Sequence, residues 1–377
     1  MNIKKRKIFY WSPSLVEIAT NMSVINSAYS LNKYSNKYCT YIINFFGEFN
    51  RFNKKFRDKD LTFLNHYHEN FYKKFPSEGK IKSRFSFLVI FLMSFFPLKR
   101  LLKKEVPDFL IIHLITSLPL VLLIFFKFKT KFILRISGFP RMNFFRKILW
   151  RLALKRIYLV TCPTQNTFKY IISLNLVDKS KIKILYDPII NLKEINKKKR
   201  ESIKIKNYFL SVGRLTKQKN FIFLCKAFKE IIKEYSDIKL LIAGNGEQEK
   251  KIKKFIEENN LAENIFLLGY IENIYPYFKN ANGFILSSLW EDPGFVLIES
   301  AFCRTPILSC NAWPGPVELI KNNVNGITFE NNNMESFLKE FKKFYNYKNK
   351  NYLLLNNLKA SKKFSLFSHY KSFVSLL

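Results

Sequence analysis

The chain has 377 residues, 48% of them hydrophobic, and its 64 Lys and Arg against 28 Asp and Glu give a formal net charge of +36. This length exceeds what one hydrophobic core usually supports, so two domains are expected. The charge predicts an anionic partner, namely nucleic acid, anionic lipid or a phosphorylated substrate, although a general enrichment in Lys, Asn, Ile and Phe accounts for part of it. Five cysteines, an odd number without a Cys-x-x-Cys pair, argue against a disulfide framework or a zinc site and fit a reducing compartment.

The positive charge is concentrated in the first half of the chain. Residues 1–187 contain 34 Lys or Arg and 10 Asp or Glu, a net charge of +24, whereas residues 188–377 contain 30 and 18, a net charge of +12. The first of the two expected domains is therefore the better candidate for contact with an anionic surface.

The first domain is predicted to begin with a strand over 7–11, followed by a loop that contains Ser14 and by a helix over 20–32. A second strand is expected over 38–46. Residues 47–84 are polar and carry basic runs, so they are expected to be irregular.

Further buried strands in the first half end in polar residues. Residues 108–113 end in His113, and residues 131–138 include Arg135 and end in the loop Ser137-Gly138. Because open parallel sheets bind ligands at the carboxyl ends of their strands, these residues and Ser14 are candidates for contacts in a cleft. A purely structural hydrogen-bonding role is the alternative for His113 and Arg135.

Two strongly apolar stretches, 85–97 and 118–126, are expected to form buried helices. Neither reaches the ~18–20 apolar residues that a transmembrane helix needs, so no membrane span is expected. Residues 141–157 are predicted to form a basic helix.

The second half shows a regular alternation of strands and helices, which predicts a parallel sheet covered by helices on both faces. The expected elements, strands and helices in turn, are 208–212, 220–235, 238–243, 247–259, 264–268, 273–280, 283–287, 295–303, 305–309 and 315–321. Residues 191–206, rich in Lys, Asn and Glu, are expected to link the two domains.

The stretch 287–299 places two carboxylates around a strand-to-helix turn. Glu291 lies on the loop and Glu299 lies inside the helix, with Pro293 near the helix start, where its missing N–H costs little. The unpaired amides of a helix start suit an anion, and an ionised carboxylate suits a sugar diol, which donates two hydrogen bonds. A capped helix with two solvated Glu residues is the alternative.

The blocks around this stretch resemble those of the family 4 retaining glycosyltransferases of the GT-B fold. Glu291 and Glu299 match the family's Glu-x7-Glu signature, and Gly294 matches the glycine that follows the first Glu. Three further blocks occur in the family's order and spacing, namely the phosphate-binding Arg/Lys stretch, the third conserved block and the block beside the nucleotide base: 211–220, 240–246 and 265–270.

The resemblance implies an α/β protein of GT-B architecture, with two Rossmann-like domains whose parallel sheets face a central cleft. It implies an acceptor-binding domain over 1–190 and a nucleotide-sugar-binding domain over 191–363. Residues 364–377 would form a helix that crosses back to the first domain.

The resemblance also assigns roles to single residues. Arg214 and Lys219 would stabilise the diphosphate leaving group and Glu291 would meet hydroxyl groups of the donor sugar, so these three are the candidate catalytic residues. Glu299 would hold the ribose diol. The other candidates for donor binding are Gly294, Phe295, Gly244, Asn245, Tyr270 and Gly315.

This chain departs from the family pattern at two places. Ser137 stands where many members carry a His that faces the donor sugar, which puts a catalytic His in question. Asp292-Pro293 replaces the common Gly-Phe pair, and proline cannot donate a backbone hydrogen bond.

No metal and no other cofactor are implied, because side chains and helix dipoles would carry the phosphate charge. Two patterns offer a weak alternative. Asp58-Lys59-Asp60 matches the Asp-x-Asp pattern of metal-dependent glycosyltransferases but follows no apolar strand, so chance explains it better. His66-Tyr67-His68 lacks an evident third ligand and is expected to be a surface pair.

The implied reaction moves a sugar, with retention, from a nucleotide-diphosphate donor to a glycan acceptor that is expected to be lipid-linked, in bacterial surface polysaccharide or lipopolysaccharide synthesis. Two alternatives remain. One is a basic nucleic-acid-binding protein, which the lack of an organised aromatic stacking strip argues against, so nucleic acid is not an expected partner. The other is a GT-B enzyme acting on soluble substrates, such as a sugar-nucleotide epimerase or a phosphorylase.

The location expected from these features is cytoplasmic, on the inner face of the membrane. The basic residues Lys4 to Lys7 precede no long apolar signal core. The basic helix over 141–157, with Lys147, Arg151 and Lys155 four apart on one side, is expected to dock on anionic lipid, helped by Lys99, Arg100, Lys103 and Lys104. A domain helix with a buried apolar face and a solvated basic face is the alternative.

Overall fold

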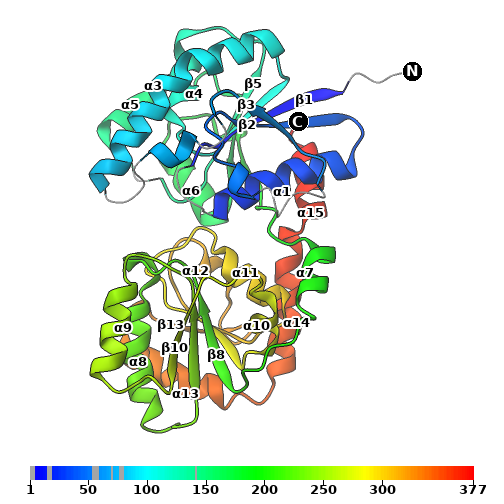
Figure 1. The fold of residues 1–377 in the computed structure, drawn as a ribbon. Coiled ribbons are helices and arrows are strands. Elements are labelled where there is room, and N and C mark those ends of the chain that lie inside the picture. The colour runs from blue at the N-terminus through cyan, green and yellow to red at the C-terminus, as the bar shows by residue number, and fades with distance from the viewer. Residues whose placement is uncertain (1–4, 15–18, 53–58, 69–70, 76–79, 141) are drawn as a thin grey trace. The chain divides into compact units, whose positions relative to one another are not determined.

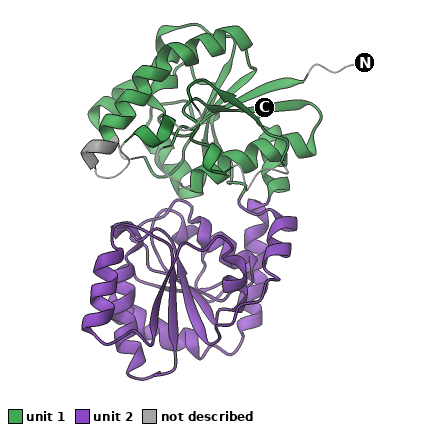
Figure 2. Ribbon diagram, in the orientation of Figure 1, with its two compact units in different colours: residues 1–188, 366–377 green, residues 189–365 purple. Residues whose placement is uncertain are grey.

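The computed structural model describes residues 5–14, 19–52, 59–68, 71–75, 80–140 and 142–377 (Figure 1). The chain divides into two compact units (Figure 2). Unit 1 comprises residues 1–188 and 366–377, and unit 2 comprises residues 189–365. The boundaries expected from the sequence, after residues 190 and 363, each differ from these by two residues.

Unit 1 is built on a seven-stranded parallel sheet in the order β3-β2-β1-β4-β5-β6-β7. Its strands are β1 (Arg6–Trp11), β2 (Tyr38–Asn44), β3 (Thr62–Asn65), β4 (Phe109–Ile112), β5 (Lys131–Arg135), β6 (Leu159–Cys162) and β7 (Ile182–Ile184). Its α-helices are α1 (Ala19–Tyr34), α3 (Lys80–Glu105), α4 (Ser117–Phe125), α5 (Phe144–Ala153), α6 (Gln165–Ser173) and α15 (Leu366–Val374). Short 3-10 helices are η1 (Asn50–Phe52), η2 (Phe71–Lys74) and η3 (Lys179–Lys181).

The sheet of unit 1 is apolar on both faces, because parallel strands are covered by helices on each side. Alternate residues of β1 enter different cores: Phe9 and Trp11 belong to one, and Ile8 and Tyr10 to the other. The second core also contains Phe373 of α15, which packs on α1. Residues 366–377 therefore complete unit 1.

Unit 2 contains a six-stranded parallel sheet in the order β10-β9-β8-β11-β12-β13. Its strands are β8 (Tyr208–Val212), β9 (Lys239–Ala243), β10 (Ile265–Gly269), β11 (Gly283–Leu286), β12 (Ile307–Cys310) and β13 (Ile327–Phe329). Its helices are α7 (Leu192–Lys198), α8 (Phe221–Ile232), α9 (Glu249–Glu258), α10 (Tyr275–Asn280), α11 (Phe295–Phe302), α12 (Pro316–Leu319), α13 (Met334–Tyr345) and α14 (Lys350–Ser361), with the 3-10 helices η4 (Lys217–Lys219) and η5 (Lys362–Phe364). The predicted α/β architecture of two Rossmann-like domains is confirmed.

Each sheet has a point at which the strand order reverses. In unit 2 this point lies between β8 and β11, which pair directly, and in unit 1 it lies between β1 and β4. Loops that leave neighbouring strands at such a point run to opposite sides of the sheet and open a crevice for a ligand. The loops after β8 and β11 are those that contain the Arg/Lys stretch and the Glu-x7-Glu stretch.

Several local expectations were wrong. Strand β3 lies in 47–84, which was expected to be irregular, because pairing with β2 stabilises a segment of weak sequence pattern. The basic helix is shorter than 141–157 and covers Phe144–Ala153, after an Asn143 cap.

The prediction that 85–97 forms a buried helix was also wrong, because α3 leaves a row of large apolar side chains exposed. Within the described part of the chain, α3 contains a segment, Arg84–Glu105, that is long and apolar enough to cross a membrane by length and composition alone. The expectation that no stretch reaches this length is wrong because α3 continues past Lys99 to Glu105.

Candidate functional site

The loops that follow β8 and β11 are joined by an ion pair at the point where the strand order of unit 2 reverses. Lys219, the last residue of η4, places its Nζ against Oε1 of Glu291, and both side chains are about nine-tenths buried, with 13% and 9% exposed. The hydroxyl of Ser288 donates to the same Oε1 at 2.7 Å. The Oε2 atom of Glu291 makes no hydrogen bond to the described residues and remains available as an acceptor.

Backbone contacts hold these two loops in register. The amide of Leu289 donates to the carbonyl of Gln218 at 2.8 Å, and the Gln218 side chain donates to the carbonyl of Trp290 at 2.8 Å. The Ser287 hydroxyl donates to the carbonyl of Lys219 at 3.0 Å. Hydrogen bonds to backbone carbonyls of both loops therefore hold the two residues of the ion pair in place.

Arg214 lies two residues after the end of β8 and differs from Lys219 in its surroundings. Its side chain is exposed, and no hydrogen bond or ion pair of its guanidinium is found among the described residues. The loop after β8 thus contains two exposed basic side chains, Arg214 and Lys217, and the largely buried Lys219, which is paired with a carboxylate.

Gly244 forms a close backbone crossing between the loops that follow β8 and β9. Its N–H donates to the carbonyl of Gly269 at 2.7 Å, and its φ of +139° is rarely adopted by other residues. A Cβ at this position would lie 1.9 Å from the carbonyl oxygen of Gly213. The neighbouring Asn245 is exposed and accepts a hydrogen bond from the amide of Leu215 at its carbonyl, at 2.9 Å.

We expect Gly244→Ala to unfold unit 2 or to destabilise it by more than the about 1–3 kcal/mol that backbone strain alone costs, because strain and a clash with backbone are combined. Gly269→Ala in the same unit is the matched control, since its φ is +67° and the nearest group, the Asn245 amide oxygen, lies 3.5 Å from a built Cβ. The control should cost about 1–2 kcal/mol. Urea unfolding of both variants measures the difference, and equal losses would contradict the close crossing.

A second close crossing shapes the turn before α11. Gly294 precedes the helix with a φ of +97°, and Phe295 is its first residue. The amide of Gly315 donates to the Glu291 carbonyl at 2.9 Å, and a Cβ on Gly315 would lie 2.2 Å from the carbonyl oxygen of Pro293. The turn that contains Gly315 is thus packed directly on the turn that contains Glu291.

Glu299 lies in the second turn of α11, where a residue of α10 contacts it. The hydroxyl of Tyr275, the first residue of α10, donates to Oε1 of Glu299 at 3.1 Å. Burial raises the pKa of the Glu299 carboxyl to about 7, although the Tyr275 hydrogen bond and the charge of Lys198 act in the opposite direction. At neutral pH this carboxyl is poised between its two protonation states. Tyr270, the remaining candidate of unit 2, is more than half exposed at the end of β10.

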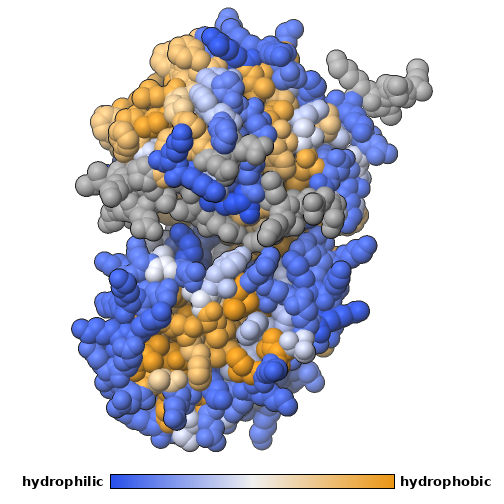
Figure 3. Space-filling model, in the orientation of Figure 1, coloured by the Kyte–Doolittle hydropathy of each residue, from blue (hydrophilic) through white to orange (hydrophobic). Residues whose placement is uncertain are grey.

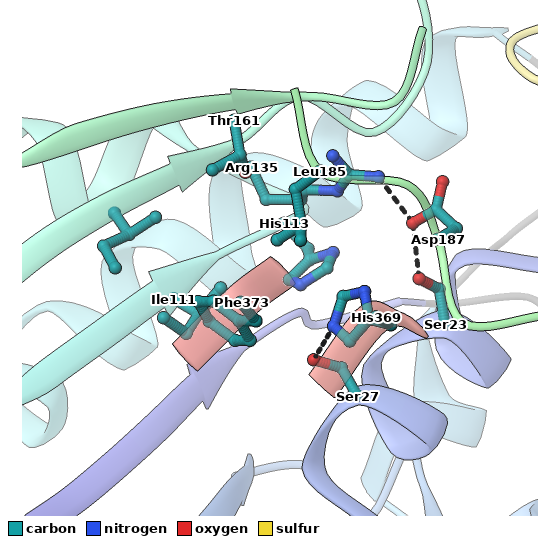
Figure 4. Close-up of a pocket in the computed structure, with 11 residues that line it drawn as sticks. Ser23, Ser27, Ile111, His113, Arg135, Thr161, Leu185, Asp187, His369 and Phe373 are labelled. Carbon is teal, nitrogen blue, oxygen red and sulfur yellow. Dashed lines mark hydrogen bonds and ion pairs between the residues drawn. The ribbon is translucent and has the colours of Figure 1, made fainter. Parts of the chain in front are cut away.

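The candidates of unit 1 belong to a buried polar cluster between the sheet, α1 and α15 (Figure 4). The carboxylate of Asp187 lies 2.7 Å from Nη2 of Arg135 and accepts a hydrogen bond from Ser23 at 2.6 Å. Both charged side chains are less than one-tenth exposed. Arg135 therefore holds a structural ion pair inside unit 1.

Two histidines complete this cluster. Nε2 of His369 lies 2.8 Å from the Ser27 hydroxyl, and its Nδ1 lies 2.7 Å from the Tyr186 carbonyl oxygen, to which it donates. Nδ1 of His113 lies 3.2 Å from the Ser137 hydroxyl. Burial lowers the pKa of His113 to about 3 and that of His369 to about 4, so both rings are neutral at pH 7. The cluster encloses a cavity of about 10 Å³, about the size of one water molecule.

The last two candidates of unit 1 differ from one another. The Ser14 hydroxyl accepts a hydrogen bond from Asn21 at 2.7 Å and lies at the edge of the described loop, since residues 15–18 are outside the described ranges. Gly138 has a φ of +95° with open space around its Cα. Asp187, Ser23, Ser27 and His369 were not predicted, because hydrogen bonds between distant segments leave no spacing in the sequence.

The weak metal patterns are not supported by a ligand cluster within the described ranges. Asp58 lies outside the described residues, and Asp60 is exposed. No group of three or more His, Cys, Asp or Glu side chains that could hold a metal ion occurs in the part of the chain that the structure describes.

Comparison with known structures identifies the architecture as the GT-B fold. The chain matches a crystal structure of the Anabaena protein HepE, in complex with UDP and glucose, with a TM-score of 0.69 and 14% sequence identity over 99% of each chain. This likeness concerns the fold, and the predicted GT-B architecture is confirmed.

Sequence comparison supports the family resemblance. Residues 193–359 match the family model described as Glycosyl transferases group 1. An uncharacterised glycosyltransferase of Methanocaldococcus jannaschii is 32% identical over 248 residues, 60% of this chain and 61% of its own length. An N-acetylgalactosaminyltransferase of Campylobacter jejuni that is named for a diphospho-undecaprenol substrate is 34% identical over 167 residues, 44% of this chain and 45% of its own.

The predicted resemblance to family 4 glycosyltransferases of the GT-B fold is thereby confirmed. The chain spans about three fifths of the first of these relatives and less than half of the second. The matched residues 193–359 lie within unit 2, which contains the Lys219–Glu291 pair and Glu299.

Proposed function

We propose that the protein is a retaining glycosyltransferase that moves a sugar from a nucleotide-diphosphate donor to a lipid-linked glycan acceptor in the synthesis of a bacterial surface polysaccharide. The observation that carries this proposal is the buried Lys219–Glu291 pair at the strand-order reversal of unit 2, with Arg214 unpaired and exposed on the same loop. Open α/β sheets bind their ligands at such reversals. The match of residues 193–359 to group 1 glycosyl transferases supports it.

In the proposed reaction the bond between the anomeric carbon and the phosphate oxygen breaks, and its electron pair leaves with the nucleoside diphosphate. The acceptor oxygen forms the new bond on the same face of the sugar, and its proton passes to a phosphate oxygen of the donor. Lys219 and Arg214 stabilise the charge that grows on the leaving diphosphate. Glu291 holds Lys219 in place through Oε1 and accepts a donor-sugar hydroxyl at Oε2.

The same proposal assigns the donor-binding residues. The amides at the start of α11, at Gly294 and Phe295, face the sugar and phosphate, and Glu299 accepts the ribose hydroxyls. The HepE structure holds UDP and glucose, which makes a UDP-sugar the first donor to test. No metal is needed in this scheme, since two basic side chains carry the phosphate charge.

The acceptor is proposed from the Campylobacter relative, whose name specifies diphospho-undecaprenol. A polyprenyl diphosphate is anchored in the cytoplasmic membrane, so the enzyme would work at the inner face of that membrane. The protein is to be incubated with UDP-, GDP- and ADP-sugars and a polyprenyl-diphosphate glycan. NMR of the product then shows which donor is used and whether the anomeric configuration is retained. A product of inverted anomeric configuration, or hydrolysis without transfer, would count against retention or against transfer respectively.

Glu299→Ala is expected to weaken donor binding by the about 1.5–3 kcal/mol of each charge-assisted hydrogen bond that the ribose diol loses. Isothermal titration with the panel of nucleotide sugars measures the affinity, and a thermal melt checks that the variant is folded. Unchanged affinity in a folded variant would exclude the ribose role.

Donor affinity should also depend on pH. Burial raises the pKa of Glu299 to about 7, and the diol needs the charged form, so affinity should fall about tenfold between pH 8 and pH 6. Glu299→Gln should remove this dependence. Tyr275→Phe, which deletes the hydrogen bond that lowers this pKa, should move the dependence to higher pH. An identical pH profile for all three proteins would contradict the assignment.

A further inference from the structure

Helix α3 has two apolar faces, and unit 1 covers only one of them. Residues four apart along the helix are buried against the unit: Ser86, Ile90, Ser94, Leu98 and Leu102. The row on the outer face is mostly more than half exposed: Phe85, Leu88, Leu92 and Phe96. A helix that is apolar on all sides normally lies inside a protein or in contact with lipid, so the outer face needs a partner.

Helix α5 continues this exposed apolar surface. Its outer residues are Phe144, Phe145, Ile148 and Leu152, and Phe145 is 80% exposed. Trp150 and Ala153 hold the opposite side in the core. The alternative, a helix with a buried apolar face, therefore holds for one side of α5 only, because its other apolar residues are exposed.

The two helices are connected through α4, which packs on both and ends in the exposed Phe125. Figure 3 shows apolar side chains gathered over the part of unit 1 where Figure 1 places α3, α4 and α5. We call this the outer apolar surface, formed by Phe85, Leu88, Leu92, Phe96, Phe125, Phe144, Phe145, Ile148 and Leu152. Contiguous exposed apolar patches on a soluble protein mark a binding surface.

The charges along the same helices are almost all positive. The exposed basic residues on these helices and their connections include Arg84, Arg100, Lys103, Lys104, Lys127, Lys129, Arg146, Lys147, Arg151, Lys155 and Arg156. Between residues 80 and 157 the only acidic side chains are Glu105 and Asp108, and both are engaged by Lys7, Glu105 in an ion pair and Asp108 by the backbone amide. Apolar residues among cationic ones, without free carboxylates, match the boundary between anionic headgroups and acyl chains.

We propose that the outer apolar surface inserts into an anionic lipid bilayer, with α3 and α5 lying in the plane of its interface. This inference does not depend on glycosyl transfer. Although α3 is long enough to span a membrane, Ile90, Leu98 and Leu102 belong to the core of unit 1, so spanning would remove them from it. A second copy of the chain is a poorer occupant, because the basic residues would then face each other.

Insertion differs from purely electrostatic docking in its response to salt. Charge attraction is screened at about 1 M NaCl, where the Debye length falls to about 3 Å, whereas burial of apolar side chains persists. Full-length protein is therefore to be co-sedimented at low and high salt with vesicles of phosphatidylcholine alone and of equimolar phosphatidylcholine and phosphatidylglycerol. We expect binding to the mixed vesicles that weakens in high salt but remains measurable.

Three variants separate the apolar from the electrostatic contribution to vesicle binding. The triple variant Leu88→Ser, Leu92→Ser, Phe96→Ser should lose the salt-resistant binding by about a hundredfold or more, since each buried side chain changes the partition constant by about tenfold. Lys147→Glu, Arg151→Glu, Lys155→Glu should lose only the salt-sensitive part. Val324→Ser, Tyr352→Ser, Leu355→Ser replaces three apolar residues of unit 2 that are 39–52% exposed, and this variant should bind as the unchanged protein does.

Thermal melts and titration with nucleotide sugars show whether each variant keeps its fold. The proposal is overturned if the α3 triple variant binds vesicles as well as the unchanged protein, or if the unit 2 control loses as much. It is also overturned if the unchanged protein ignores vesicles and instead forms dimers in sedimentation velocity that the α3 substitutions abolish.

Discussion

Replacement of Lys219 by alanine is expected to lower kcat by about 10²–10³-fold, the usual effect of removing one preorganised group that stabilises charge in a transition state. The Nζ of Lys219 is held by Glu291 and sits in a largely buried position, where a charge acts more strongly than in water. Because the negative charge on the leaving diphosphate grows as the bond breaks, kcat should fall more than donor affinity. Single-turnover kinetics with the nucleotide sugar that the protein uses would separate the effect on kcat from the effect on donor affinity.

Lys217→Ala is the matched control, since Lys217 begins the same 3-10 helix but is exposed. This variant should keep its turnover within about twofold, as expected for an exposed charge that contributes little. Arg214→Ala should also lower turnover, and EDTA should not. A strict need for added divalent metal would contradict the scheme and direct attention back to Asp58 and Asp60.

Among the ion pairs, the largest effect on stability is expected for Asp187→Ala, which should destabilise unit 1 by about 3–5 kcal/mol. Arg135 is 3% exposed and would keep its charge without the carboxylate that faces it at 2.7 Å. The Ser23 hydroxyl would lose its acceptor as well. Urea unfolding followed by limited proteolysis of unit 1 measures the change.

Glu105→Ala serves as the control in the same unit. Its ion pair with Lys7 has the same charges, but both side chains are more than one-third exposed, so the expected loss is below about 1 kcal/mol. Similar losses for Asp187→Ala and Glu105→Ala would show that burial does not decide the contribution of the Arg135 pair.

The same cluster makes unit 1 sensitive to acid. The folded pKa values of His113 and His369, about 3 and 4, lie below the ~6.5 of an unfolded histidine, so the unfolded chain binds protons first as pH falls. Below about pH 6.5 the free energy of unfolding should decrease, by up to about 2–3 kcal/mol per pH unit for two histidines. For Asp187, burial acts to raise the pKa, but Arg135 holds it below its usual value. Its contribution is thus present above an unfolded aspartate's pKa and is lost only in stronger acid. Urea unfolding at pH 7, 6 and 5 tests the histidine effect, and His369→Gln should reduce the slope.

Much of the fold could be predicted from local patterns. Strands β8 to β12 are short apolar runs followed by polar or glycine residues, and the helices between them repeat apolar positions at helical spacing, so this alternation follows from local patterns alone. Strand β13 and helices α7, α13 and α14 were not among the expected elements. Lys219, Glu291 and Glu299 are candidates because they lie in sequence blocks that resemble those of a known family. Their mutual geometry follows from the strand order, which the sequence does not state.

The features that were missed depend on contacts between distant segments. Tyr275 contacts Glu299 from another helix, and Asp187 contacts Arg135 only when β5 packs with the segment that follows β7. Strand β3 is defined by β2 rather than by its own composition. The sequence predicts that the apolar row on α3 is buried, because hydrophobicity shows the need for an apolar neighbour without showing whether that neighbour is protein.

The return of α15 to unit 1 sets an order in which the two units can be finished during synthesis. Unit 2 is continuous, residues 189–365, whereas unit 1 needs residues 366–377, made after all of unit 2. Until those residues leave the ribosome, the core under α1 lacks Phe373, and the Ser27 hydroxyl lacks the His369 ring. The half of the chain that is translated first therefore reaches its native state last, and its basic apolar helices emerge while that unit is still incomplete.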